Sequence, residues 1–385
     1  MDITELFTTA VEAGASDLHR KSGNYPMMRV HGELRPITTD RRFDPATLEG
    51  LAAALVPAAL QPRLAREHEV DFAHSVSGLG RFRCNVFRQR GTVAMVLRVI
   101  PMQVRSIEDL ALPPILKTIA AGERGLVLLT GTTGSGKSTT LAALVDHINH
   151  TRAAHIMTVE DPIEYLHQDD RSIINQREVD VDTKSFAQAL RSALRQDPDV
   201  ILVGEMRDLE TVETGLTAAE TGHLVMSTVH TLDATETINR MIAVFPPHQH
   251  QQIRMQMASV LRAVISQRLL PNIDGTGRCA AIEILVNTPF VSDCILDPDR
   301  TQLIQSAIAA GTSQYGMQTF DQAIYELYQD GRVSYDTALR WASNRDEFMM
   351  RVQGVTSTSD GAHDEMADAR PGRTGEPPTI TRFGE

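Results

Sequence analysis

The residues best suited to phosphate chemistry lie in the segment GTTGSGKS, from Gly131 to Ser138. The segment matches G-x-x-x-x-G-K-[ST] at every fixed position, follows an apolar run and opens an amphipathic helical pattern. Glycines let backbone N–H groups turn toward phosphate oxygens, and a helix N-terminus adds positive potential. We expect Lys137 to reach the β- and γ-phosphates of ATP and Ser138 to ligate Mg²⁺. The nucleotide is expected to contact Gly131, Thr132, Thr133, Gly134, Ser135, Gly136, Lys137, Ser138 and Thr139.

Carboxylates follow two other apolar runs, and strand geometry indicates which of them are relevant. Ligands of an open parallel sheet bind beyond the C-terminal ends of its strands, and the phosphate loop marks that edge. In DVILVGE, Asp199 precedes the apolar run and Glu205 follows it. At about 3.3 Å per residue, Asp199 lies roughly 20 Å from Glu205, at the opposite edge. Glu205 is therefore the candidate for the magnesium site, although Gly204 stands where many nucleotide hydrolases carry an aspartate.

The same rule assigns groups from two further runs. HIMTVEDPIE ends its strand at Glu160 and continues to Glu164, whereas HLVMSTVHT ends at His230. Either glutamate could polarise the attacking water, Glu205 could order magnesium through its waters, and His230 could sense or bond the γ-phosphate. The residues alone do not separate Glu160 from Glu164. His223 precedes its strand and is expected far from the γ-phosphate of its own subunit.

The γ-phosphate also needs cationic stabilisation. Arg195 or Arg207 could supply it within the subunit. Alternatively Arg81, Arg83 and Arg98 of the first domain could act in trans, which would favour a ring.

These groups require a scaffold, and the chain divides into a small first domain and a larger second one. Residues 1–100 predict a mixed α+β domain with a hairpin in PMMRVHGELRPI. Within residues 81–86 apolar and polar side chains alternate, so one face of that strand is apolar and the other basic. Residues 101–112, which open at Pro101 and lead into Pro113 and Pro114, predict a linker.

Residues 113–350 predict the second domain, in which apolar strands alternate with amphipathic helices around a mostly parallel sheet. A long helix is expected over residues 248–270, then a strand in CAAIEILV and a helical pair over residues 318–345. Residues 351–385 are polar and rich in Gly, Pro, Ser and Thr, which predicts a disordered tail.

Composition excludes several classes of protein. A formal net charge of -12 argues against a general nucleic-acid binder, and no run of about 18 apolar residues predicts a transmembrane helix. The three cysteines are far apart and form no CxxC pair, so neither disulfides nor a zinc site is expected. The acidic N-terminus carries no secretory signal, which favours a cytoplasmic location.

Five longer segments carry a family resemblance: GTTGSGKSTT, TVEDPIEYLHQ, NQREV, ALRSALRQDPDVILVGEMRDLET and GLTAAETGHLVMSTVHT. The chain closely resembles the secretion-superfamily ATPases, whose motifs are called Walker A, Asp box, Walker B and His box. Within them it is most similar to the type IV pilus retraction ATPases of the PilT/PilU family. The likeness covers roughly residues 1–345, including GASDLH and GLGRFR.

This resemblance implies a PAS-like N-terminal domain, a RecA-like P-loop ATPase domain and a homo-hexameric motor that powers pilus retraction and twitching motility. It implies a cytoplasmic position at the inner-membrane base of the pilus, beside a platform protein of that membrane. By the same likeness Glu164 is the favoured catalytic base and Glu205 the Walker B carboxylate, and Gly204 is normal for the family.

The segment Phe290–Arg300, FVSDCILDPDR, departs from the PilT branch because it lacks the first arginine of an Ala-Ile-Arg-Asn-Leu-Ile-Arg-Glu-like stretch. GMQTFDQAIYELYQDGRVSYDTAL and the polar tail resemble the PilU branch instead. The alternative function is therefore an accessory retraction ATPase that needs a PilT-type partner. Pilus extension motors usually carry four cysteines within the ATPase domain, and a DNA translocase conflicts with the acidic composition, so both are disfavoured.

Overall fold

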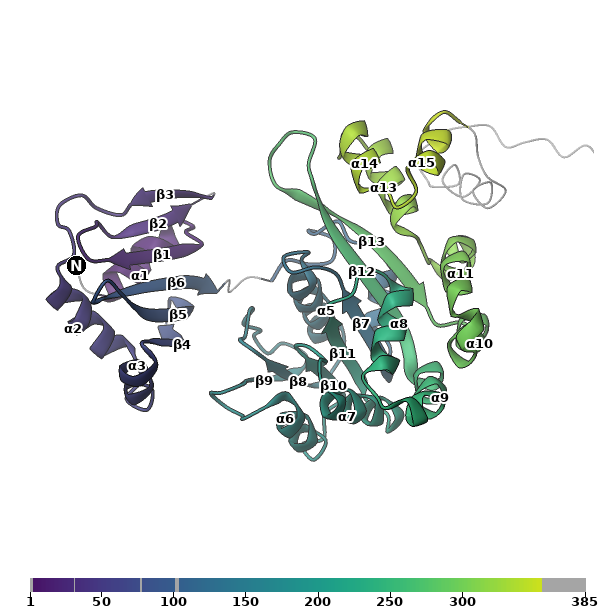
Figure 1. Ribbon diagram of the computed structural model, residues 1–385, viewed down its shortest axis with the longest axis horizontal. Helices are drawn as coiled ribbons and strands as arrows, with labels where there is room; N and C mark the ends of the chain where they lie inside the picture. The colour runs from purple at the N-terminus through teal and green to yellow at the C-terminus, as the bar shows by residue number, and fades with distance from the viewer. Residues whose placement is uncertain (1–2, 31, 77, 101–103, 355–385) are drawn as a thin grey trace, which may run out of the picture. The chain divides into compact units, whose positions relative to one another are not determined.

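The computed structural model describes residues 3–30, 32–76, 78–100 and 104–354. They fall into two compact units (Figure 1). Unit 1 combines the N-terminal residues up to Asp109 with Ser138–Glu205, and unit 2 combines Leu110–Lys137 with the chain from Met206 onward. No helix in these ranges is both long enough and apolar enough to cross a bilayer.

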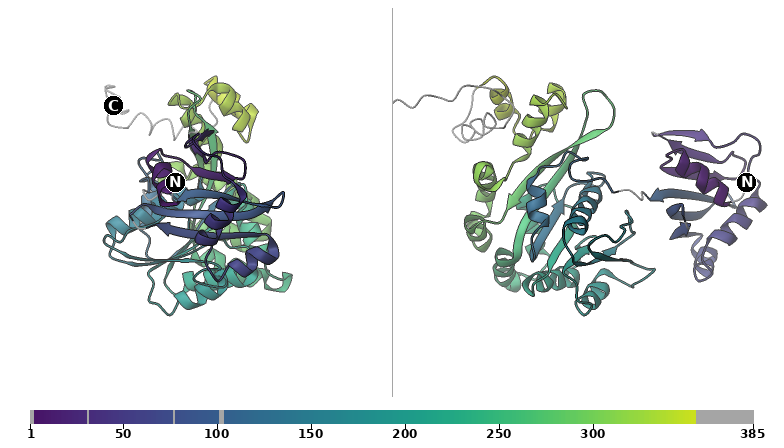
Figure 2. Two further views of the ribbon diagram at one scale, coloured as in Figure 1. Left: turned by 90° about the vertical axis from the view of Figure 1, so that its left-hand side faces the viewer. Right: turned by 180° about the vertical axis from the view of Figure 1, so that it is seen from behind.

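The N-terminal part of unit 1 is an antiparallel sheet of six strands in the order β3-β2-β1-β6-β5-β4. Its elements are α1 (Ile3–Glu12), β1 (Asp17–Lys21), β2 (Met27–Val30), β3 (Glu33–Pro36), α2 (Pro45–Leu55), α3 (Gln61–Glu67), β4 (Glu69–Val76), β5 (Gly80–Gln89) and β6 (Thr92–Ile100). The core joins Phe7 of α1 and Leu48 of α2 to Leu18 and Phe82 of the sheet, so both helices pack on one face (Figures 1 and 2). This confirms the predicted mixed α+β domain and its hairpin.

Strand β5 shows the predicted alternation. Phe82, Cys84 and Val86 are buried in the core, whereas Arg81 and Arg83 lie on the other face. Such alternation follows from the two-residue period of a strand. All three cysteines of the chain are buried and unpaired, as predicted.

The remainder of unit 1 contains α5 (Lys137–Thr151) from Ser138, the last residue of the phosphate loop, onward. It also contains the elements β8 (His155–Glu160), β9 (Ile173–Glu178), α6 (Phe186–Ala193) and β10 (Val200–Val203). The strands are parallel in the order β10-β8-β9. Val203 of β10 lies beside Val159 of β8. Glu160 and Glu205 therefore emerge at the same edge, as the sequence predicted. Strand β9 was not predicted.

Unit 2 contributes four strands in the order β13-β12-β7-β11. Its elements are α4 (Ile115–Ala120), β7 (Gly125–Thr130), α7 (Leu209–Glu220), β11 (Leu224–Val229), α8 (Ala234–Ala243), α9 (His250–Val260), β12 (Leu261–Pro271), β13 (Arg278–Val286), α10 (Pro289–Leu296), α11 (Ile304–Ala310), α12 (Thr312–Tyr315), α13 (Phe320–Gln329), α14 (Tyr335–Trp341) and α15 (Arg345–Val352). Strand β7 pairs in parallel with both β11 and β12, and β12 pairs antiparallel with β13. The sheet is thus mostly parallel, as predicted.

The predicted helix over residues 248–270 is wrong in its second half. Helix α9 ends at Val260, and β12 begins at Leu261. Residues 263–267 are buried without interruption, because β12 lies between β7 and β13 with both of its faces covered. A strand buried in this way shows no alternation that would distinguish it from a buried helix.

Two predicted boundaries change. Ile107 and Leu112 are buried, so the later part of the predicted linker 101–112 packs into the fold, while residues 101–103 lie outside the described residues. Helix α15 continues to Val352, beyond the predicted domain end at residue 350. The predicted tail 351–385 lies outside the described residues from 355 onward.

Candidate active site

The phosphate loop of unit 2 is backed by β12, which explains two of its glycines. A Cβ atom on Gly131 would overlap the carbonyl oxygen of Gln267, and one on Gly136 would lie 2.7 Å from the Gln267 side-chain nitrogen. Both glycines also have left-handed φ angles, 140° and 91°. The buried Lys137 ammonium donates hydrogen bonds to the carbonyl oxygens of Gly131 (2.8 Å) and Thr132 (3.0 Å). The ammonium is therefore held inside the loop, where phosphates would meet it.

A cavity of about 510 Å³ adjoins the first half of the phosphate loop in unit 2. Its walls come from the loop, from the end of β12 and from α14. Three arginines line it, together with the only tryptophan of the chain: Arg268, Arg278, Arg340 and Trp341. Positive charge beside the loop suits a polyphosphate ligand.

The two histidines near β11 lie at opposite ends of that strand. His230 follows β11 at the end where β7 leads into the phosphate loop, and its side chain is exposed. His223 precedes β11, and its carbonyl oxygen accepts a hydrogen bond from the N–H of Gly125 at the start of β7. The chain thus places His223 at the edge away from the loop, as the sequence indicated.

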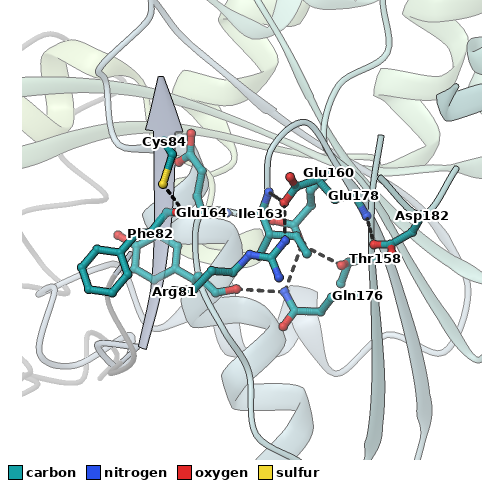
Figure 3. Close-up of polar contacts among 11 residues, drawn as sticks. Arg81, Phe82, Cys84, Thr158, Glu160, Ile163, Glu164, Gln176, Glu178 and Asp182 are labelled. Carbon is teal, nitrogen blue, oxygen red and sulfur yellow. Dashed lines mark hydrogen bonds and ion pairs between the residues drawn. The ribbon is translucent and has the colours of Figure 1, made fainter. Parts of the chain in front are cut away.

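The Asp box of unit 1 is the segment TVEDPIEYLHQ, Thr158–Gln168, and its two glutamates lie in different environments (Figure 3). The Glu160 carboxylate accepts hydrogen bonds from the Thr158 hydroxyl (2.6 Å) and the Gln176 side-chain amide (3.1 Å). Burial raises the pKa of the Glu160 carboxyl, and these two hydrogen bonds offset that effect only in part. Glu164 is exposed, and its backbone N–H lies 3.5 Å from Glu160 Oε2. Glu160 is thus an anchored group, whereas Glu164 presents a solvated carboxylate.

Glu205 lies next to the Asp box because Gly204 allows close approach. The Gly204 N–H donates to the carbonyl oxygen of Val159 at 2.7 Å. A Cβ atom at Gly204 would lie 3.3 Å from that oxygen and 3.4 Å from Glu160 Cα. Asp199 is at the other end of β10, where its carboxylate accepts the N–H of His155 at 2.8 Å. Glu205, and not Asp199, therefore shares the edge with Glu160.

Strand β9 adds Gln176 and Glu178 to the site. The sequence alone assigned no role to either residue. Gln176 bonds Glu160, and Glu178 accepts the backbone N–H of Ile163 within the Asp box at 3.2 Å. The only signal for them was the NQREV segment noted in the family resemblance, which carried no assigned role.

The candidate trans arginines have partners within their own subunit. Arg81 Nη2 donates to Glu178 Oε2 at 2.8 Å (Figure 3), and Arg98 Nε donates to Asp17 Oδ1 at 2.9 Å. Arg83 is exposed and, within the described part of the chain, forms no ion pair. The trans role therefore fits Arg83 better than the other two.

The remaining candidate cations are on the surface. Arg195 is exposed in the loop after α6 in unit 1. Arg207 of unit 2 is exposed beside Asp208, whose carboxylate caps α7 by accepting the Thr211 N–H at 2.9 Å.

Comparisons with known proteins agree on one family. The family model described as "Type II/IV secretion system protein" matches residues 2–371. The type IV pilus ATPase PilU of Pseudomonas aeruginosa is 41% identical over 363 residues, which cover 94% of each chain. The type IV pilus retraction ATPase PilT of the same organism is 44% identical over 352 residues, covering 90% of this chain and 100% of PilT.

A solved structure gives the same result. The crystal structure of the pilus retraction motor PilT with bound ADP superimposes with a TM-score of 0.84 at 44% sequence identity. It covers 90% of this chain and 98% of that one.

Proposed function

Because the chain belongs to the type II/IV secretion system protein family and, within it, to the PilT/PilU group of ATPases, we propose that it is a motor that retracts type IV pili. The observation that carries this proposal is the combination of a complete phosphate loop with two differentiated Asp-box glutamates. A subunit with only a scaffolding role would need neither.

In the proposed reaction, the loop N–H groups and Lys137 hold the β- and γ-phosphates of ATP. Glu164 accepts a proton from water as the water oxygen attacks the γ-phosphorus, and the bond from that phosphorus to the ADP oxygen breaks. His230 contacts the γ-phosphate, and Arg207 or Arg195 adds positive charge. The exposed carboxylate of Glu164 suits contact with water, whereas the bonded carboxylate of Glu160 suits support of the turn.

Magnesium fits the residues present. The described residues contain no cluster of three or more His, Cys, Asp or Glu side chains that could cage a metal by themselves. Mg²⁺ ordinarily keeps several waters and binds through one or two protein groups plus substrate phosphates. The Ser138 hydroxyl, with Glu205 acting through water, would hold it, and the ion would neutralise charge on the phosphates.

Assembly and location are also part of the proposal. We propose a homo-hexamer at the cytoplasmic base of the pilus, gripping an inner-membrane platform protein. The N-terminal antiparallel sheet with two helices on one face supports a PAS-like assignment, and the parallel strands around the phosphate loop support a RecA-like one. Mass photometry with and without ATP tests the hexamer.

A second candidate is an accessory, PilU-like motor that works beside a PilT-type ATPase. Two observations support this accessory role as a second candidate: the match to PilU over 94% of both chains, and the altered segment Phe290–Arg300.

A deletion strain scored for surface pili and twitching tests the retraction role. Piliated, non-motile cells are expected, whereas bald cells would contradict the proposal. Purified protein should hydrolyse ATP, and Lys137→Ala should remove that activity. Complementation of a strain that lacks every PilT-type ATPase separates an independent motor from an accessory one.

A further inference from the structure

The loop that joins β8 to β9 carries the Asp-box carboxylates, and its hydrogen bonds converge on one side chain. Gln176 Nε2 donates to Glu160 Oε1 at 3.1 Å (Figure 3). The same nitrogen donates to the carbonyl oxygen of Tyr165 at 2.8 Å. Gln176 Oε1 accepts the backbone N–H of His167 at 3.0 Å. The Gln176 amide thus forms three hydrogen bonds, and all three are with residues of the Asp box.

The strand register explains why this residue meets the loop. Thr158 of β8 lies beside Gln176 of β9, so the two hydrogen-bond donors to Glu160 come from neighbouring positions of the pair. Successive side chains of a strand point to opposite faces. Asn175, the preceding residue, accordingly bonds the ring of His155 at 2.8 Å, away from the Asp box.

A second contact joins this segment to the helix that follows the phosphate loop. The Tyr165 hydroxyl and the Thr139 hydroxyl are 2.8 Å apart. Thr139 is in the first turn of α5, directly after Ser138. A bonded chain therefore runs from Thr139 through Tyr165 to Gln176, and from Gln176 to Glu160.

We propose that Gln176 is a positioning residue for ATP hydrolysis: its amide fixes the Glu160 carboxylate and the turn that carries Glu164, and Tyr165 ties that turn to the phosphate-binding helix. The inference rests on the proposed function, because it assumes that Glu164 acts on ATP. Among the described residues Gln176 forms hydrogen bonds with Glu160, Tyr165 and His167 and with none of residues 131–139, so its effect is on the placement of the catalytic carboxylate.

Loss of the amide has two consequences. The turn loses the anchors at Tyr165 and His167, so Glu164 samples more positions and productive encounters become rarer. Within the part of the chain that the structure describes, Glu160 then keeps the Thr158 hydroxyl as its one side-chain donor. The neighbouring charge of Glu164 already disfavours ionisation of Glu160, and Glu178, on the same face of β9, is paired with Arg81. The pKa of the Glu160 carboxyl therefore rises further when the Gln176 donor is removed.

The central experiment compares Gln176→Met, which keeps the volume and removes the amide, with Gln176→Ala and with Asn175→Ala as the matched control. Both Gln176 variants should lower kcat about tenfold or more while KM for ATP changes less than about twofold. The acidic limb of the kcat–pH profile should move to higher pH. Asn175→Ala should match the wild type in all three measurements. Wild-type kcat and an unshifted profile in Gln176→Met would overturn the proposal.

Two further measurements make the result independent of folding and of the reaction itself. Tyr165→Phe removes one hydroxyl and should lower kcat several-fold, and its failure to do so would contradict the link to α5. Amide hydrogen exchange at Ile163, Glu164 and His167 should quicken in Gln176→Met but not in Asn175→Ala. If the wild-type protein proved inactive, the proposed function would fail, and the exchange rates would still decide whether Gln176 holds the turn.

Discussion

Arg81 of β5 and Glu178 of β9 form an ion pair whose side chains are only 17% and 5% exposed. The same Glu178 oxygen also accepts the N–H of Ile163, so the arginine and the Asp box share one carboxylate. Strand β5 belongs to the N-terminal sheet, and β9 follows the Asp box in the chain. The pair is therefore a direct contact between the two sheets that contribute to unit 1.

The first prediction concerns this pair. Arg81→Ala leaves a buried carboxylate without its cation and should lower the free energy of unfolding by about 3–5 kcal/mol. Arg83→Ala, on the exposed face of the same strand, should change it by less than about 0.5 kcal/mol. Chemical denaturation of both variants and of Glu178→Ala provides the measurement. If Arg81 acts in trans on ATP instead, Arg81→Ala will lose ATPase activity at unchanged stability.

The second prediction separates the two Asp-box glutamates. Glu164→Gln should lower kcat by about 10²-fold or more, because a general base typically contributes that much, while ADP affinity stays near wild type. Glu160→Gln keeps an oxygen that can accept the Thr158 hydroxyl, so it should lower kcat less. Single-turnover ATP hydrolysis with parallel nucleotide titrations makes the comparison. A larger kcat loss in Glu160→Gln would reverse the assignment of the base.

The third prediction concerns the phosphate loop. Gly136 and Gly134 both have left-handed φ angles, 91° and 79°, but only the Cβ position of Gly136 meets the Gln267 side chain. Gly136→Ala therefore combines backbone strain with a steric clash, whereas Gly134→Ala has strain alone. We expect ADP affinity, measured with a fluorescent ADP analogue, to fall more in Gly136→Ala than in Gly134→Ala, because the Gln267 amide must shift in the first variant only. Equal losses would show that contact with β12 is unimportant for loop shape.

The fourth prediction concerns pH. Burial lowers the pKa of the His167 ring to about 4, below its usual 6.5. The unfolded chain therefore binds a proton between these values that the folded chain does not, so stability decreases as pH falls through this range. The contribution approaches about 1.4 kcal/mol for each pH unit. Denaturant midpoints measured from pH 7 to pH 4 should show a shallower slope in His167→Gln, and the exposed His248→Gln serves as the control. Parallel slopes in wild type and His167→Gln would contradict the assignment.

The sequence by itself determined the phosphate loop and the edge at which the carboxylates lie. The GTTGSGKS motif is local, and the rule that ligands meet the C-terminal ends of parallel strands needs only the order of apolar runs and carboxylates. Those two facts were enough to choose Glu205 over Asp199 and to set His223 apart from His230.

Only the tertiary structure decided which groups those carboxylates contact. The register of β8 against β9 places Gln176 beside Thr158, so both side chains donate to the half-buried Glu160 carboxylate, whereas Glu164 is exposed. The sequence also could not show that Arg81 and Arg98 form ion pairs within their own subunit. Nor could it show that residues 261–271 form a strand. A side chain's hydrogen-bond partners and a buried segment's conformation depend on neighbours that are distant in the chain. Local spacing cannot specify them, because the same apolar run satisfies a buried helix and a strand that is covered on both faces.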